Sequence, residues 1–192
     1  MTLPSFKIDK SWTLFLDRDG VINVKRDNDY VKHWGEFIFL PGVFEAMEIF
    51  NKMFDTIVIV TNQRGIGRKL MTNEDVQDIH QRMRSEIESK GGRIDQIYYC
   101  PDLAEEDHRG WRKPEPGMAF EAKRMYPEID FKKSLIIGDS ISDMEFGRNA
   151  GMYSVWLSEK EIQEEHKTLI DAQTHSLLEF AKLLETKAKQ EA

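Results

Sequence analysis

Acidic residues occur in two short groups whose spacing suits a divalent cation. Asp17 and Asp19 are two residues apart after one apolar run, and Asp139 and Asp143 are four apart after another. Carboxylates gathered at one place carry excess negative charge, which a hard divalent cation with oxygen ligands neutralises. The sequence therefore predicts a Mg²⁺ site built from these acids.

Polar residues of other types follow two further apolar runs. They are a hydroxyl, two amides and two cations: Thr61, Asn62, Gln63, Arg112 and Lys113. Phosphoryl transfer needs a nucleophile, an acid for the leaving oxygen, and positive charge around the equatorial oxygens of phosphorus. A carboxylate can attack phosphorus to give an aspartyl phosphate. The acids and these five residues together supply those parts.

The elements that must position these residues are short strands alternating with helices. Runs that are apolar on both faces predict buried parallel strands at 12–16, 56–60, 94–99, 135–137 and 154–157. Helical spacing predicts helices at 43–52, from a Thr72 cap to the glycines at 91–92, and at 116–126, 142–150 and 177–189. We expect a three-layer α/β/α Rossmann-like fold with about five parallel strands, and its chemistry at the carboxyl ends of the strands.

Composition limits the function classes. The chain has 192 residues, a formal net charge of −7 and one cysteine. These values exclude an internal disulfide framework and count against broad nucleic-acid binding. No apolar run reaches the roughly 18–20 residues that span a bilayer, and residues 1–10 lack the apolar middle of a secretory signal, so we expect no leader there. We expect a cytoplasmic monomer with a single domain over residues 1–192, without nucleic-acid or membrane partners.

The four polar segments resemble the four motifs of the haloacid dehalogenase-like (HAD) phosphatases. DRDGVIN at 17–23, VTNQRGI at 60–66 and RKPEPGM at 112–118 are similar to subfamily IIIA, in the branch that holds heptose 1,7-bisphosphate 7-phosphatases and histidinol-phosphatases. The resemblance extends from about residue 14 to 157. It implies a Mg²⁺-dependent phosphomonoesterase with an aspartyl-phosphate intermediate. The intervals between the motifs are too short for a large cap domain.

The resemblance also implies roles for the acids and the lysine. Asp17 would be the nucleophile and a Mg²⁺ ligand, and Asp139 would complete the metal site. Asp19 would act as general acid and base, with its carbonyl on the metal. Neighbouring carboxylates are expected to raise the pKa of Asp19. Lys113 would neutralise the nucleophile, and Asp143 would orient Lys113 or a metal-bound water.

The remaining predicted site residues contact the substrate or support the site. By resemblance, Thr61 and Asn62 would hold the transferring phosphoryl group. Asn23 and Gln63 are assigned to substrate binding, and Gly138 supports the metal site.

Two departures from the family pattern affect cofactor and substrate. Many members of this branch carry a zinc loop before the lysine, but only Cys100 stands in place here, with His108 as a displaced second ligand. Asp102, Arg109 and Trp111 occupy the other ligand positions. A structural zinc site needs about four ligands, mostly nitrogen or sulfur, so we predict no zinc.

The second departure is Arg64, which stands where the branch commonly has a small residue. With Arg112, and with Arg68 and Lys69 nearby, it is predicted to bind a second phosphate of the substrate. This favours the 7-phosphate of a heptose 1,7-bisphosphate, with histidinol phosphate as the alternative.

Two rival functions share parts of this site. A polynucleotide 3′-phosphatase would need a basic groove with stacking aromatics, against which the net charge counts. A non-enzymatic phospho-receiver would lack the extra acid that Asp19 supplies. Outside the site, His80, His166 and His175 are expected on helix or loop surfaces, and residues 159–165 are expected to form a solvated helical face.

Overall fold

The structure is a computed structural model, and it describes residues 7–190. The sequence predicts no secretory leader in residues 1–10, and residues 1–6 of that segment lie outside the described residues. Within 7–190, none of the helices combines the length and the apolar character needed to cross a bilayer.

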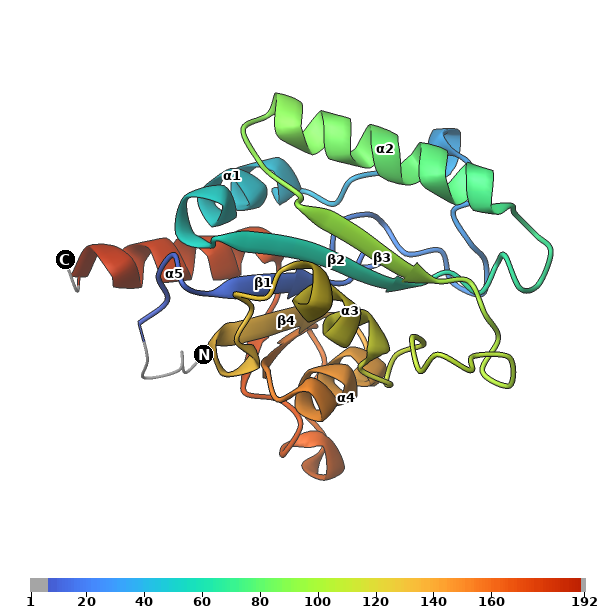
Figure 1. Cartoon of the computed structure of the whole chain (residues 1–192). Helices are drawn as coiled ribbons and strands as arrows, with labels where there is room; N and C mark the ends of the chain where they lie inside the picture. The colour runs from blue at the N-terminus through green and yellow to red at the C-terminus, as the bar shows by residue number, and fades with distance from the viewer. Residues whose placement is uncertain (1–6, 191–192) are drawn as a thin grey trace.

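Within the described residues, six parallel strands form one sheet in the order β3-β2-β1-β4-β5-β6. Figure 1 shows β3, β2, β1 and β4 following one another in this order. They are β1 (Thr13–Leu16), β2 (Thr56–Asn62), β3 (Gln96–Cys100), β4 (Ser134–Gly138), β5 (Tyr153–Leu157) and β6 (Ala172–Thr174). The five predicted strands are confirmed. The sixth was missed because β6 has only three residues, two of them polar, and so carries no apolar run.

In the described part of the chain, five α-helices cover the sheet. They are α1 (Val43–Met53), α2 (Asn73–Ser89), α3 (Gly117–Met125), α4 (Ile141–Ala150) and α5 (Leu177–Gln190). One core cluster joins α1, α2 and α5 to Leu14 and Leu16 of β1, and the second joins α3 and α4 to Phe15 between them. Successive strand residues therefore face opposite layers, which gives the predicted three-layer α/β/α fold.

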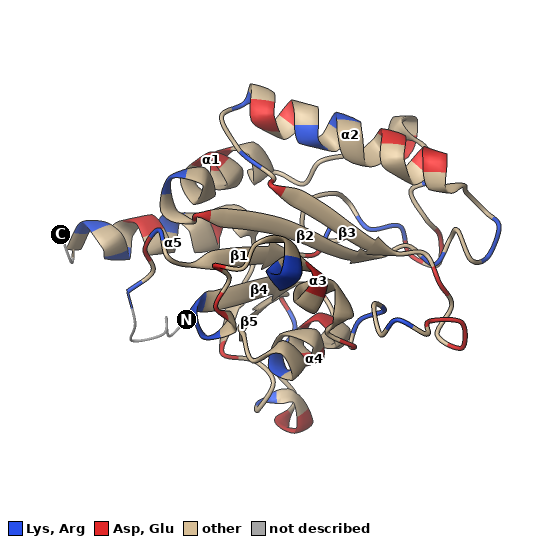
Figure 2. Cartoon of the chain, viewed as in Figure 1, with Lys and Arg blue, Asp and Glu red and all other residues tan. Residues whose placement is uncertain are grey.

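Local signals in the sequence set the ends of the helices. Thr72 caps α2, since its side chain accepts from the N–H of Asp75 while the Asp75 carboxylate accepts from the Thr72 N–H. Gly151 ends α4 with a φ of +84°, a left-handed conformation that favours glycine. Figure 2 shows charged residues on the helices and loops, while the strands are mostly uncharged.

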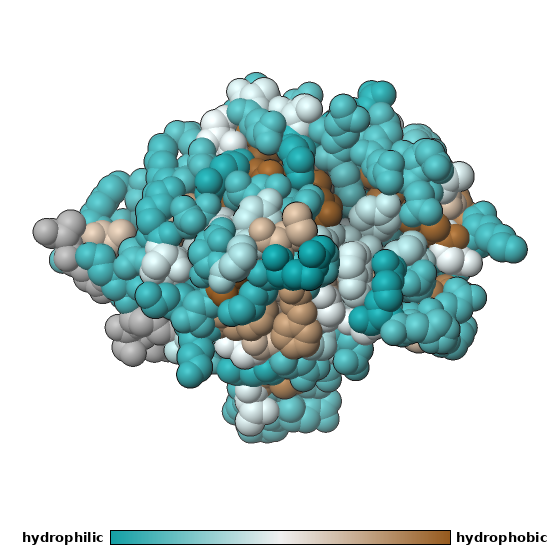
Figure 3. Space-filling view, in the orientation of Figure 1, coloured by the Kyte–Doolittle hydropathy of each residue, from teal (hydrophilic) through white to brown (hydrophobic). Residues whose placement is uncertain are grey.

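The segment after β5 differs from its prediction. Residues 158–163 form no helix, and only a short 3₁₀ turn follows at Glu164–His166 (η3). Most of these residues are exposed, so the segment is solvated as expected but is not helical. The face in Figure 3 is largely hydrophilic, with a few hydrophobic residues between polar ones.

Candidate active site

The sheet order brings the predicted motifs to one edge. Asp17 follows β1, Thr61 and Asn62 end β2, and Asp139 follows β4. β1 lies between β2 and β4, and all three strands are parallel, so their carboxyl ends meet. A cavity of about 580 Å³ opens there. Eight predicted residues line it: Asp17, Asp19, Thr61, Asn62, Arg64, Arg112, Lys113 and Asp139.

Lys113 is the centre of a buried charge cluster. Its Nζ lies 2.8 Å from Asp17 Oδ1 and 2.5 Å from Asp143 Oδ1, and it donates to the Val60 carbonyl at 2.9 Å. The side chains of Lys113 and Asp143 are 2% and 0% exposed. Although burial opposes it, the carboxylates of Asp143 and Asp17 raise the pKa of Lys113. Lys113 is therefore a fixed cation beside Asp17.

Burial is also the largest influence on Asp17. It raises the pKa of this carboxyl to about 7, with Asp143 and Asp139 adding to the effect and Lys113 opposing it. A divalent cation beside Asp17 would favour its ionised form, the form in which a carboxylate can attack phosphorus.

Asp19 is held as a carboxylate by several donors. Arg18 Nη2 donates to both of its oxygens at 3.0 and 2.9 Å, Asn23 Nδ2 to Oδ1 at 2.9 Å, and Gln63 Nε2 to Oδ2 at 2.9 Å. Burial favours the neutral acid, but Arg18 and these hydrogen bonds outweigh it and lower the pKa of Asp19. The predicted rise was therefore wrong, because hydrogen-bond donors surround Asp19.

Three amide side chains bind other residues of the site, and for Asn23 and Gln63 this differs from the predicted role. Asn23 and Gln63 are 0% and 1% exposed, do not line the cavity, and bind Asp19 instead of facing a substrate. Asn62 exchanges two hydrogen bonds with the backbone of Lys113, at 3.0 and 3.1 Å. These amides position Asp19 and Lys113; the contact of Asn23 is local, whereas those of Gln63 and Asn62 join residues 44 and 51 apart in the sequence.

The acids fit a hard divalent cation. Oxygens of Asp17, Asp139 and Asp143 all lie within 4.8 Å of one another. Asp143 is engaged by Lys113 and by Ser140, whose N–H and Oγ donate to Oδ2. Asp139 Oδ1, in contrast, is buried without a hydrogen-bond partner among residues 7–190. Asp17 and Asp139 are therefore the side chains available to such an ion.

Two glycines allow the acids to come this close. A Cβ on Gly20, whose φ is +89°, would lie 2.4 Å from Asp139 Oδ2. A Cβ on Gly138 would lie 2.2 Å from the Cβ of Asp143. Gly138 thus supports the site by leaving room for Asp143.

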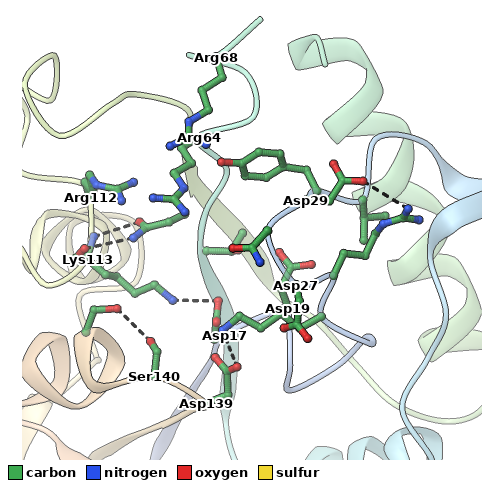
Figure 4. Close-up of a pocket in the computed structure, with 18 residues that line it drawn as sticks. Asp17, Asp19, Asp27, Asp29, Arg64, Arg68, Arg112, Lys113, Asp139 and Ser140 are labelled. Carbon is green, nitrogen blue, oxygen red and sulfur yellow. Dashed lines mark hydrogen bonds and ion pairs between the residues drawn. The ribbon is translucent and has the colours of Figure 1, made fainter. Parts of the chain in front are cut away.

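Three arginines line one side of the cavity (Figure 4), and the rest of the lining carries acids together with Lys25 and Arg26. Arg64, Arg68 and Arg112 lie on the first side, and Asp27 and Asp29 lie across from them. Arg112 Nη1 is buried with no hydrogen-bond partner in the described part of the chain. An unpaired buried guanidinium donor suits an anion.

The sequence prediction missed two further contacts of the site. Lys25 donates to Asp139 Oδ2 at 2.6 Å. Arg18 is 1% exposed, and its Nη1 lies 3.1 Å from His80 Nε2. His80 is itself only 6% exposed, so its predicted surface position was wrong. The signal was present, because His80 has helical spacing with Val76 on the buried face of α2.

The loop before Lys113 is held by polar contacts. Arg109 forms an ion pair with Asp102 at 3.1 Å and stacks over Trp111 at 4.3 Å. Asp107 accepts from the N–H of Arg112 at 2.6 Å. Cys100, Asp102 and Asp107 place one potential ligand atom each within 4.8 Å of one another.

Comparisons with known proteins show the family of the chain. The HAD-hydrolase-like family model matches residues 110–180. The D-glycero-alpha-D-manno-heptose-1,7-bisphosphate 7-phosphatase of Mycobacterium bovis is 41% identical over 142 residues, which are 72% of each chain. The D-glycero-beta-D-manno-heptose-1,7-bisphosphate 7-phosphatase of Photorhabdus laumondii is 41% identical over 69% of this chain and 72% of that protein.

A solved structure supports the same assignment. The D,D-heptose 1,7-bisphosphate phosphatase from B. bronchiseptica, complexed with magnesium and phosphate, has a TM-score of 0.80 at 29% identity, covering 92% of this chain and 99% of that one. The fold and the site define a phosphatase of the HAD-like hydrolases, and the chain belongs to that family. Within it, the chain falls in the heptose bisphosphate phosphatase branch. The phosphatase prediction is confirmed, and the non-enzymatic receiver is set aside.

Proposed function

We propose that this phosphatase removes the 7-phosphate of D-glycero-D-manno-heptose 1,7-bisphosphate. The observation that carries the proposal is the arrangement of charge in the cavity. Asp17 lies beside the buried cation of Lys113, and Arg64, Arg68 and Arg112 add further cations along one side of the same cavity. A doubly phosphorylated sugar has two anionic ends that match these two regions.

The proposed reaction has two steps. Asp17 attacks phosphorus, the bond from phosphorus to the sugar oxygen breaks, and Asp19 donates a proton to that oxygen. Water then attacks the phosphoryl group on Asp17, Asp19 takes the proton, and inorganic phosphate leaves with Asp17 restored. The carboxylate form of Asp19, which its donors favour, is the form needed in the second step.

Asp19 must carry a proton for the first step. A phosphate dianion bound beside Asp17 adds like charge close to Asp19, and like charge raises a carboxyl pKa. Substrate binding therefore opposes the effect of the donors on Asp19.

Lys113 and Thr61 surround the transferring group. Lys113 stays charged because Asp143 and Asp17 stabilise its ammonium, and it balances the charge that develops on phosphorus. Thr61 lines the cavity, and its Oγ accepts from Gln63 Nε2 at 2.9 Å, which leaves the hydroxyl proton for phosphate.

The proposed metal is Mg²⁺, held by Asp17, Asp139 and the backbone carbonyl of Asp19. When bound, it supplies positive charge beside the phosphate oxygens. The proposal is supported by the unpartnered Oδ1 of Asp139 and by the magnesium in the related solved structure.

Phosphate release from the heptose bisphosphate tests the function, with histidinol phosphate assayed at the same concentration. We expect Mg²⁺-dependent release from the bisphosphate at least about tenfold above histidinol phosphate in kcat/KM, and loss of activity in Asp17→Asn. Equal or greater activity on histidinol phosphate would overturn the substrate assignment.

The arginines can be tested separately. Arg64→Ala and Arg112→Ala are each expected to raise KM for the bisphosphate about tenfold, the effect of one lost charged hydrogen bond, and to leave KM for the 7-monophosphate unchanged. Arg82→Ala, on the exposed face of α2, is the matched control. Equal changes for both sugars would show that these arginines do not bind the second phosphate.

We also propose that the loop at 100–112 holds no zinc. Cys100 is buried, which raises the pKa of its thiol, and His108 is not part of the group formed with Asp102 and Asp107. The ion pair and stacking of Arg109 stabilise the loop instead. Metal analysis of protein purified without chelators is expected to find less than about 0.1 zinc per chain, against the one that a structural site would hold. One zinc per chain would contradict this.

The remaining proposals concern the state of the protein in the cell. We propose a cytoplasmic monomer with one domain, acting on a small phosphorylated sugar and not on nucleic acid, in agreement with the net charge of −7. Light scattering after size exclusion is expected to give a mass close to 22.5 kDa. A dimer mass would refute the monomer.

A further inference from the structure

We infer that His80 is a positioning residue for the proton transfers of Asp19, acting through the buried guanidinium of Arg18. The inference rests on the proposed aspartyl-phosphate mechanism. It extends that mechanism to a side chain on α2 that does not line the cavity.

The contacts form a chain from α2 to the general acid. His80 Nε2 lies 3.1 Å from Arg18 Nη1, and Arg18 Nη2 reaches both oxygens of Asp19 at 3.0 and 2.9 Å. A guanidinium only donates, so the imidazole nitrogen must be the acceptor. The planar guanidinium of Arg18 contacts both residues and therefore fixes the position of Asp19 relative to His80.

His80 is suited to this role because it is neutral. Its surroundings, chiefly burial and then the charge of Arg18, hold the pKa of His80 well below its usual value. The ring also meets the edge of Tyr99, at 5.4 Å between centroids. A neutral imidazole that is fixed in this way keeps a lone pair directed at Arg18.

Arg18 has little freedom to replace this acceptor. Its side chain is 1% exposed, and its Nε has no hydrogen-bond partner within residues 7–190. Without His80, Nη1 would be a second unpaired donor of a buried cation, and such a group moves toward any acceptor or water it can reach. The hydrogen bonds of Arg18 to Asp19 would move with it.

A change in the position of Asp19 affects only the steps in which Asp19 moves a proton. In the first step a sugar oxygen leaves as the alcohol and needs the proton of Asp19. 2,4-Dinitrophenolate is stable as an anion and leaves without a proton. Loss of the positioning of Asp19 should therefore lower kcat/KM for the sugar phosphate and leave kcat/KM for 2,4-dinitrophenyl phosphate nearly unchanged.

The experiment compares kcat/KM for heptose 1,7-bisphosphate and 2,4-dinitrophenyl phosphate. This constant reports only the steps up to and including departure of the leaving group, which contain the first proton transfer of Asp19. We expect His80→Phe to lower the value at least about tenfold for the bisphosphate, part of a general-acid contribution of about 10²–10⁴, and less than about twofold for the aryl substrate. His80→Gln supplies an acceptor oxygen and is expected to restore the bisphosphate value to within about threefold of the wild type.

The second half of the reaction gives an independent readout. Because Asp19 also activates water, His80→Phe should slow hydrolysis of the phosphoryl enzyme and enlarge the burst of dinitrophenolate. Met83→Ala, in the apolar core under α2, is the control for destabilisation of the helix and should change both substrates equally.

The outcomes separate this inference from the proposed function. Failure of the wild type to form phosphoryl-Asp17 would remove the mechanism itself. With an active wild type, equal losses for both substrates, or no loss with the bisphosphate, would overturn the role of His80. If His80→Phe does not fold, the ¹⁵N shifts of His80 decide: a neutral ring with a hydrogen-bonded Nε2 at pH 6 supports the role, and a protonated ring refutes it.

Discussion

Replacement of Lys113 by methionine tests whether the buried charge cluster stabilises the fold. Lys113 is 2% exposed and contacts the carboxylates of Asp17 and Asp143, whose side chains are 10% and 0% exposed. Methionine keeps the approximate length of the side chain but leaves both carboxylates without their cation. Breaking a buried ion pair from one side costs about 3–5 kcal/mol. At about 2–4 °C per kcal/mol for a chain of this size, Tm should fall by roughly 6–20 °C.

The measurement is thermal and urea unfolding of metal-free protein in EDTA. Lys52→Met is the matched control, because its ion pair with Glu48 has nearly the same length, 2.7 Å, but Lys52 is 64% exposed. Both variants remove one positive charge, so their net charges are equal. Lys52→Met is expected to leave Tm unchanged within error. If the two variants lose the same stability, burial does not determine the strength of the cluster, and the reasoning fails.

Three further predictions follow from local geometry. Gly20→Ala should displace Asp139 and weaken Mg²⁺ binding, measured by calorimetry, at least about tenfold. Gly151→Ala is the control, because Gly151 has a similar φ of +84° but a Cβ there would meet nothing within 4 Å. Equal Mg²⁺ affinity in the two variants would contradict this prediction. The pKa of His80 is lowered in the folded protein, so below pH 6.5 only the unfolded chain binds a proton at this residue. The free energy of unfolding should therefore decrease as the pH is lowered below 6.5, by up to about 1.4 kcal/mol per pH unit. His80→Gln should show a shallower pH dependence of this free energy in urea titrations. Thr72→Ala should lower Tm by about 2–4 °C through loss of the α2 cap, and an unchanged Tm would show that the cap does not hold the helix.

The strands and helices were predictable because their signals are local. Each signal spans only a few consecutive residues, as do the apolar runs of β1, β2 and β4 and the capping box at Thr72. β6 was not predictable from its own residues, because the pairing of Val155 with Ala172 across the sheet edge defines it. The predicted helix at 159–165 was wrong because its charge pattern indicates exposure to solvent and not helix formation.

The site shows the same division. The positions of Asp17, Thr61, Lys113 and Asp139 at one cavity follow from motifs placed after parallel strands. The environment of Asp19 does not, because it depends on how the loop after β1 folds Arg18 and Asn23 back onto Asp19 and on Gln63, which comes from 44 residues away in the sequence.

The sequence by itself determined the fold class, the motif residues and the reaction type, since each depends on residue type and short-range spacing. Only the tertiary structure decided which of those residues face the cavity and which support them. It turned Asn23 and Gln63 toward Asp19, buried His80 against Arg18, and lowered the pKa of Asp19. The physical reason is that hydrogen-bond partners and burial come from contacts between segments far apart in the chain, such as Arg18 and His80, which lie 62 residues apart.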